Sequence, residues 1–141
     1  MKGRSPRTRA RSWVLQLLYA WEISGEPSLI EFAEREMLRR RVGRRYRPHI
    51  DRLLRSVEGR VGGIDSLLEE CMENWRIERL SAIDRNILRL AVAELTSCPD
   101  VPVPVVIHEA IRLAEKYGSI DSPRFVNGVL DAVSRKIPVT R

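Results

Sequence analysis

Apolar residues recur along most of the chain at the spacing of an α-helix. The clearest case is residues 80–95, LSAIDRNILRLAVAEL, whose apolar side chains cover more than half of the helix circumference. Ser81 is placed to cap the first amides, and Asp84 is placed to reach back to them as in a capping box. Arg85 and Arg89, one turn apart, mark the strip that we expect to reach water. The pattern predicts a buried central helix with one polar edge.

The other segments also have helical periodicity. We expect helices over residues 6–24, 28–40, 50–61, 64–75, 106–117 and 122–137. Ser-Pro pairs predict the starts of the first and last helices, where Ser5 and Ser122 would act as N-caps, and Gly62-Gly63 predicts the end of the third. Residues 39–48, RRRVGRRYRP, contain little apolar surface and predict a loop or a frayed helix end. Because no useful stretch alternates with period two, the predicted fold class is all-α.

Length and composition indicate one domain that can bury a core without covalent cross-links. The chain has 141 residues, and Cys71 and Cys98 stand alone, which is typical of reduced thiols in a cytosolic protein. His49 and His108 accompany no metal motif, so we expect no metal site and no cofactor. No apolar run approaches the length that spans a bilayer, and no nucleophile, base and orienting group recur at a catalytic spacing.

The positive charge is concentrated in two segments. Residues 1–11 carry five basic side chains and no acid, and residues 35–60 carry ten arginines against three acids, in a chain of net charge +6. Arginine binds phosphate with two parallel hydrogen bonds and stacks on bases, so a polyanion partner is favoured. For residues 35–60, solvated helix faces explain the charge equally well.

Two features outside the predicted core are candidates for binding. A second row on the first helix lies opposite its apolar face and consists of Arg9, Ser12, Gln16 and Tyr19. This row is either an ordinary solvent-exposed face or a binding surface. Phe125 lies on the flank of the last helix, where an aromatic ring is either a lid on the core edge or a contact surface.

Four stretches together resemble the NusB family of antitermination proteins. They are RTRARSWVLQLLYAWE, LSAIDRNILRLAVAEL, DVPVPVVIHEAIRLAEKYG and IDSPRFVNGVLDAV, and they cover most of the chain outside residues 25–65. Two positions depart from the family pattern: Ser12 stands where an acid is frequent, and His108 stands where an Asn is common. We interpret His108 as a core or capping histidine.

The resemblance implies a single NusB-like RNA-binding domain over residues 1–141. Its expected fold is two small helical bundles packed across each other around a central buried helix, without enzymatic activity. Its expected partners are single-stranded boxA-type RNA of ribosomal operons and the ribosomal protein NusE, with other Nus factors and RNA polymerase as indirect partners, in the cytoplasm. The implied RNA-binding residues are Arg7, Arg9, Arg11, Gln16, Asp121 and Phe125. The implied partner-binding residues are Tyr19 and Asp84, although Asp84 has the alternative use of capping its own helix.

Three other functions compete with this interpretation. The first is a detached NusB-like domain of an RNA cytosine methyltransferase. Residues 1–141 contain no glycine-rich cofactor loop, so this function would require the sequence to be a truncated part of such an enzyme. The second is a helical DNA-binding regulator, but neither of the last two predicted helices offers a row of exposed Arg, Asn or Gln for the major groove. The third is a structural helical homodimer, which RNA binding would distinguish.

Overall fold

The structure, a computed structural model, describes residues 5–137. These residues form α-helices and short 3-10 helices, and no β-strand is found among them, which confirms the predicted all-α class. The α-helices are α1 (Pro6–Ser24), α2 (Leu29–Arg39), α3 (Arg47–Val57), α4 (Val61–Glu70), α5 (Ala82–Ser97), α6 (Val103–Tyr117) and α7 (Ser122–Lys136). The 3-10 helices are η1 (Arg44–Tyr46) before α3 and η2 (Ile77–Arg79) before α5.

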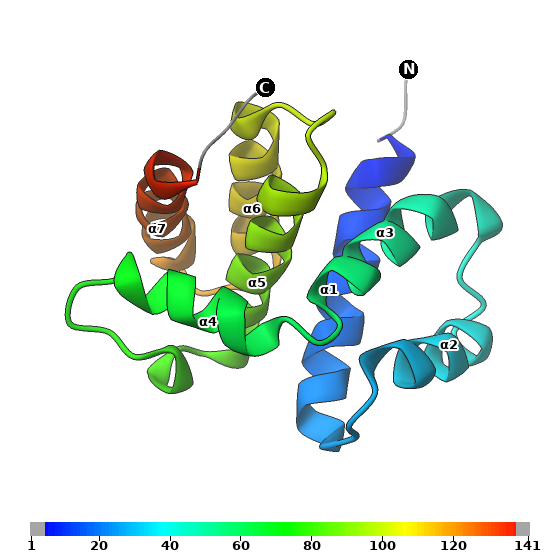
Figure 1. Ribbon diagram of the computed structural model, residues 1–141. Helices are drawn as coiled ribbons and strands as arrows, with labels where there is room; N and C mark the ends of the chain where they lie inside the picture. Colours follow the sequence, from blue (N-terminus) through cyan, green and yellow to red (C-terminus); the bar gives the residue numbers. More distant parts are fainter. Residues whose placement is uncertain (1–4, 138–141) are drawn as a thin grey trace.

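Helix α5 lies between two groups of helices (Figure 1). On one side α1, α2 and α3 pack against one another, and on the other side α4 and α6 both pack against α7. Helix α5 itself contacts α1, α3, α4, α6 and α7. This arrangement confirms the prediction of two small bundles around a central helix.

The middle of α5 is enclosed on every side. All residues from Asn86 to Leu95 are buried, and the apolar ones belong to a hydrophobic core to which both bundles contribute. A surface helix would expose a polar stripe at each turn, whereas this segment exposes none. The wide apolar arc of the sequence therefore corresponds to a helix with neighbours all round.

Capping groups set several helix ends where the sequence predicted them. The side chains of Ser5, Ser28 and Ser81 each accept a hydrogen bond from the backbone amide three residues later, at 3.1 to 3.2 Å. Gly25 ends α1 with a φ of 72°, a left-handed conformation that glycine adopts without strain. Local sequence signals therefore determine where α1, α2 and α5 begin.

The predicted helix over residues 50–61 is wrong at its C-terminal end. Helix α3 ends at Val57, and residues 62–63, predicted to be a helix stop, lie inside α4. The break occurs at Gly59, which has a φ of 74°. Val61 continues the apolar spacing across this break, so periodicity alone concealed it.

Two further helix ends differ from the prediction. Helix α4 ends at Glu70, which leaves Trp75 outside the helix and 52% exposed. Helix α6 begins at Val103 and not at Val106, because Pro104 fits the first turn, where its missing amide hydrogen has no helical partner to lose.

The polar strip of α5 is mostly enclosed: the prediction that Arg89 reaches water is wrong, and Arg85 is only partly exposed. Arg89 is 8% exposed and donates hydrogen bonds to Asp65 on α4, at 2.8 and 2.9 Å, and to Glu22 on α1, at 2.7 Å. Arg85 donates to both carboxylate oxygens of Glu22, and these bonds lower the pKa of Glu22. The two arginines therefore connect α5 to both bundles.

The burial of α5 predicts the stability effect of Leu88→Ala. Because Leu88 is fully buried in the shared core, the free energy of unfolding should fall by roughly 2–5 kcal/mol in urea denaturation. Leu38→Ala on α2, where the side chain is exposed, is the matched control and should change little. In native-state hydrogen exchange the α5 amides should be the last to open, and opening of α5 before α1 or α7 would contradict the prediction.

Candidate nucleic-acid interface

The polar row predicted for the first helix lines a groove between α1 and α6. The groove has a volume of about 380 Å³, and its lining includes Arg9, Ser12, Gln16, Arg112, Lys116 and Tyr117. Ser12 and Tyr117 join the two helices through their hydroxyl groups, 2.9 Å apart. Lys116 holds its ammonium nitrogen 5.2 Å from the centre of the Tyr117 ring. The groove therefore combines positive charge with an aromatic ring.

Arg9 and Gln16 lie together in this groove, on the face where the sequence placed them. Arg9 is exposed and Gln16 is half-buried, so both can be reached from solvent. On α6, the other wall of the groove, Arg112 donates a hydrogen bond of 3.1 Å to Glu109, one turn earlier in the same helix. That Arg9 and Gln16 contact RNA stays a prediction.

Arg11 lies in the interior, which contradicts the prediction that it faces RNA. Its side chain is 3% exposed, and it donates hydrogen bonds of 2.5 to 3.1 Å to Glu94 on α5 and one of 2.8 Å to Glu109 on α6. A buried guanidinium bonded to two carboxylates cannot reach a phosphate in the solvent. Arg11 is therefore a structural residue that fixes α1 against α5 and α6.

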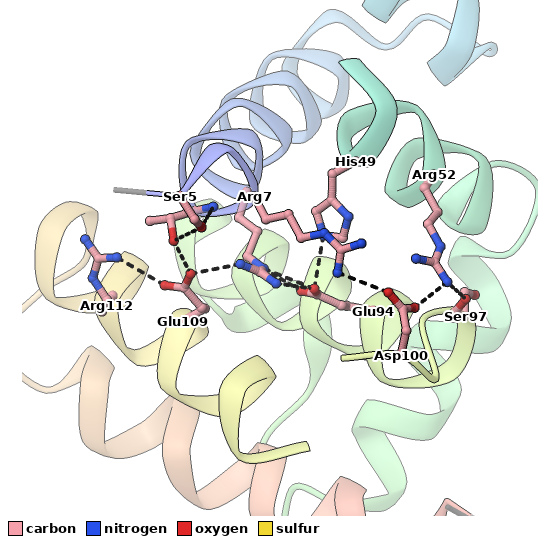
Figure 2. Close-up of polar contacts among 11 residues, drawn as sticks. Ser5, Arg7, His49, Arg52, Glu94, Ser97, Asp100, Glu109 and Arg112 are labelled. Carbon is pink, nitrogen blue, oxygen red and sulfur yellow. Dashed lines mark hydrogen bonds and ion pairs between the residues drawn. The ribbon is translucent and has the colours of Figure 1, made fainter. Parts of the chain in front are cut away.

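Glu94 is the centre of this buried network, which Figure 2 shows. Besides Arg11, the ring Nε2 of His49 on α3 lies 3.1 Å from its carboxylate. Burial alone would raise the pKa of Glu94, but the hydrogen bonds from Arg11 and His49 outweigh burial and hold it at about 2. Thr8 adds a hydrogen bond to Glu109 at the edge of the network. The network thus joins α1, α3, α5 and α6.

Arg7 lies on the other side of α1 from Arg9. The two residues are two positions apart, which is about 200° around a helix. Arg7 forms an ion pair of 3.1 Å with Asp100, whose second oxygen pairs with Arg52 of α3 at 2.7 Å (Figure 2). Arg7 therefore faces α3, while Arg9 faces α6, and the predicted basic row is divided between two surfaces.

Phe125 lies in a second hollow, of about 340 Å³, at the N-terminal ends of α5 and α7. Its lining includes Trp75, Arg79, Ser81, Asp84, Asp121 and Phe125. The rings of Phe125 and Trp75 meet edge to face, with centroids 5.7 Å apart. Phe125 thus covers the core edge and still borders a solvent-open hollow, so the structure supports both of the interpretations that the sequence left open.

Two capping predictions at this hollow, for Asp84 and for Ser122, are wrong. Asp84 accepts no hydrogen bond within residues 5–137, and its Oδ1 atom is buried without a partner, so the reach back toward Ser81 is not formed. Asp121, and not Ser122, occupies the N-cap position of α7, but its side chain makes no capping bond. Ser122 is buried and accepts a 3.0 Å hydrogen bond from the Ser119 amide.

Tyr19 lines a third, largely apolar hollow of about 490 Å³. Its lining includes Gln16, Tyr19, Ile23, Arg40, Ile83 and Tyr117. Tyr19 is 37% exposed and Ile23 is more exposed still. Tyr19 and Asp84, the two predicted partner-binding residues, therefore lie in different hollows. These hollows are neighbours, because Ile83 in one adjoins Asp84 in the other.

The α1–α6 groove and the Tyr19 hollow share part of their lining, which sequence reasoning did not anticipate. Gln16 and Tyr117 line both the α1–α6 groove and the Tyr19 hollow. Arg112 and Lys116 were missed as candidates, although their spacing of four residues places both on one face of a helix. No sequence signal indicated that this face would meet the polar row of α1.

One further prediction, for His108, is wrong. His108 is exposed, so its interpretation as a core or capping histidine is wrong. Among residues 5–137 no helix is both long and apolar enough to cross a membrane. In the same residues no cluster of His, Cys, Asp and Glu has the composition of a metal site.

A family model and several curated relatives match this chain over most of its length. The model, described as NusB family, matches residues 8–135. The transcription antitermination protein NusB of Anaeromyxobacter dehalogenans strain 2CP-1 is 42% identical in a gapped alignment of length 146 that covers 97% of this chain and 96% of that protein. The protein of the same name from Desulfosudis oleivorans is 35% identical over 133 residues, which cover 93% and 86%.

Solved structures give the same result. A structure described as T. maritima NusB matches with a TM-score of 0.85 at 35% identity, covering 95% of this chain and 94% of that one. A chain from a structure of the antitermination factors NusB and NusE in complex with dsRNA matches with a TM-score of 0.78 at 28% identity, covering 94% and 98%. The similarity therefore extends to sequence as well as fold.

The low pKa of Glu94 predicts a loss of stability in acid. A carboxyl whose pKa is lower in the folded state stabilises the fold above its unfolded pKa, and this contribution disappears as the pH falls toward the folded value. For Glu94 the window runs from its ordinary value of 4.5 down to about 2. Its contribution to the free energy of unfolding, measured by urea titration at each pH, should fall by roughly 3 kcal/mol across that window.

Two variants isolate this contribution from that of the other acids. Glu94→Gln should lower stability at neutral pH and give a flatter dependence on pH between 4.5 and 2 than the parent. Glu115→Gln, at an exposed position on α6, should follow the parent curve. A Glu94→Gln curve parallel to the parent would show that Glu94 is not held ionised by its partners.

Proposed function

The chain belongs to the NusB family, and from this premise we propose that it is a transcription antitermination factor that binds RNA together with a NusE-type protein. The relatives are named as transcription antitermination proteins, which is not an enzymatic activity. One similar structure contains NusB, NusE and dsRNA. These relatives do not favour the methyltransferase domain or the structural homodimer.

The observation that carries the proposal is the set of three hollows, two of them lined by α1 and the third at the N-terminal ends of α5 and α7. The α1–α6 groove supplies arginine and lysine for phosphates, and the Phe125 hollow supplies an aromatic pair beside a solvent-open space. Basic grooves that follow the backbone and aromatic rings that stack on unpaired bases are the usual means of recognising single-stranded RNA. The apolar Tyr19 hollow lies between these two RNA-type surfaces and suits a protein partner.

On this proposal each RNA-facing residue has a distinct task. Arg7 and Arg9 bind phosphates on the two sides of α1, and Gln16 offers an amide that can donate to and accept from a base or a ribose. Phe125 stacks on a base. Asp121 repels phosphate, so it serves by accepting a hydrogen bond from a base amino group, for which its exposed carboxylate is available.

The NusE-type partner is assigned to the Tyr19 hollow and the adjoining Asp84. The exposed side chains of Tyr19 and Ile23, with the partly buried Ile83, form an apolar area that a protein partner can bury. The carboxylate of Asp84 lines the adjoining hollow, where it offers a negative charge to a basic group of the partner.

The finer identity of the partners is also part of the proposal. The RNA would be a boxA-type single strand of ribosomal operon transcripts, and the complex with NusE would join RNA polymerase with other Nus factors in the cytoplasm. RNA affinity measured with and without the NusE-type protein tests the whole proposal. Tighter binding in its presence is expected, and no binding in either condition would refute it.

Charge removal and ring removal should affect RNA binding differently. Arg9→Gln should weaken all single strands to a similar degree and reduce the slope of log affinity against log salt by about 0.7, because one phosphate contact is lost. Phe125→Ala should cost roughly 1–3 kcal/mol with little change in slope, because stacking releases no counterions. Fluorescence anisotropy titrations of a boxA-type RNA at several salt concentrations measure both quantities.

Arg135→Gln is the matched control for charge, since Arg135 is an exposed arginine of α7 that pairs with Asp131. It should leave affinity and slope close to those of the parent. If Arg9→Gln and Arg135→Gln give the same slope of log affinity against log salt, Arg9 does not contact an RNA phosphate.

Charge changes at the two hollows should weaken binding of the NusE-type protein. Tyr19→Asp places a charge in an apolar hollow, and Asp84→Lys reverses the charge at the neighbouring one. Both should raise the dissociation constant in calorimetric titrations while circular dichroism shows unchanged helix content. Asp131→Lys on α7 is the control. If Asp84→Lys lowers only thermal stability and leaves binding unchanged, Asp84 has a structural role alone.

A further inference from the structure

A separate basic surface lies on the α3 side of α1, away from the α1–α6 groove. It borders a hollow of about 530 Å³ whose lining includes Arg7, Arg45, Pro48, His49 and Arg52. The ring of His49 is buried and bonded to Glu94, so the charge in this hollow comes from the three arginines. None of the residues that line it is an acid.

Helix α3 extends this surface by one more arginine. Pro48, Arg52 and Arg55 are spaced four and three residues apart, which places them within about 60° on one face of the helix. Arg55 is exposed. We refer to Arg7, Arg45, Arg52 and Arg55 as the second basic surface.

Two arginines of this surface are not neutralised by an acid of the described residues. Within residues 5–137 neither Arg45 nor Arg55 forms an ion pair, and Arg45 rests its guanidinium 5.0 Å from the ring of Tyr46. Other arginines of the same region are neutralised by acids: Arg35 by Glu26, Arg39 and Arg40 by Glu36, and Arg47 by Glu34 and Asp51. Arg41, Arg44 and Arg60 also form no ion pair within residues 5–137, so Arg45 and Arg55 are those unpaired arginines of residues 35–60 that belong to the second basic surface.

Asp100 occupies this surface in the way that a phosphate would. Its two oxygens accept from Arg7 and Arg52, at 3.1 and 2.7 Å, so one anion bridges α1 and α3 (Figure 2). The hydrogen bond from Arg52 holds the pKa of Asp100 below its usual range, and Asp100 stays ionised. Four arginines against this one carboxylate leave a strong positive charge.

We propose that the second basic surface binds the sugar–phosphate backbone of RNA that flanks the segment held in the α1–α6 groove. The assignment rests on the proposed function, because it extends the same RNA across the start of α1. Arg7 and Arg9 mark the two sides of that helix start, so an RNA strand that contacts both must pass over it. The hollow has no Phe, Tyr or Trp among its lining residues, and the ring of His49 is buried, so the surface contacts phosphates and not bases. Binding of the flank is therefore independent of its sequence.

The first test compares two RNAs, a boxA-type element alone and the same element between short runs of uridine. The parent chain should bind the flanked RNA more tightly and with a steeper salt dependence. Arg45→Gln/Arg55→Gln should remove that gain, reduce the salt slope for the flanked RNA by about 1.4, and leave binding of the bare element unchanged.

Arg135→Gln/Lys136→Gln is the matched control, because it removes two exposed positive charges from α7, across the molecule from α3 (Figure 1). It should retain the gain from the flanks. If the Arg45→Gln/Arg55→Gln protein keeps the gain as well, the second basic surface does not hold RNA.

The second test removes a negative charge from the second basic surface, which should strengthen RNA binding instead of weakening it. Asp100→Asn releases Arg7 and Arg52, so it should strengthen binding of the flanked RNA and increase the salt slope by up to about 0.7 for each guanidinium released. Asp131→Asn removes an exposed carboxylate that pairs with Arg135 and should leave both quantities near those of the parent. Equal effects of the two substitutions would reduce the role of Asp100 to net charge and overturn the inference.

Failure of the inference is distinguishable from failure of the proposed function. Binding of the bare element with no gain from the flanks contradicts the second basic surface alone. Absence of binding to either RNA by the parent chain, with and without the NusE-type protein, contradicts the proposed function itself. Thermal unfolding of each variant confirms that the comparison is between folded proteins.

Discussion

The buried carboxylate of Glu94 constrains the arrangement of the whole molecule. Taking an ionised group out of water costs several kcal/mol unless partners surround it, and removing one partner of a buried pair typically costs about 3–5 kcal/mol. Arg11 from α1 and His49 from α3 supply those partners, and Arg11 also reaches Glu109 on α6. With Arg11 directed inward, the rotation of α1 is fixed. Arg9 must then face the α1–α6 groove, so the core determines which side chains are offered to RNA.

A second set of charges acts at the other end of α5. Glu22 near the end of α1 binds both Arg85 and Arg89, and Arg89 also binds Asp65 on α4. Helix α1 is thus held against α5 near both of its ends, by ion pairs whose directions leave little freedom to slide or rotate. Apolar packing alone tolerates such shifts more readily, because contacts between methyl groups are not directional. This rigidity keeps the α1–α6 groove and the Tyr19 hollow at fixed positions along α1.

Periodicity and capping residues were sufficient to predict the helices and the burial of α5, because both depend on nearby residues. They failed where the deciding partner is distant in the sequence. Arg11 and Arg89 were expected at the surface because a charged residue on a helix is usually solvated, and nothing local reveals that Glu94 lies 83 residues from Arg11 or that Glu22 lies 67 from Arg89. For the same reason Lys116 was missed, since its membership of the groove depends on how α6 meets α1.

The order of side chains along α1 relates RNA binding to partner binding. Its outward row begins with the charge of Arg9, passes through Gln16 and ends at Tyr19 beside the exposed Ile23. Gln16 borders both hollows, so a protein seated on Tyr19 would lie directly beside the RNA groove. The partner protein would then contact the RNA directly, without any change in the shape of this chain. Cooperative binding of RNA and a NusE-type protein therefore requires only a shared boundary, which a rigid α1 supplies.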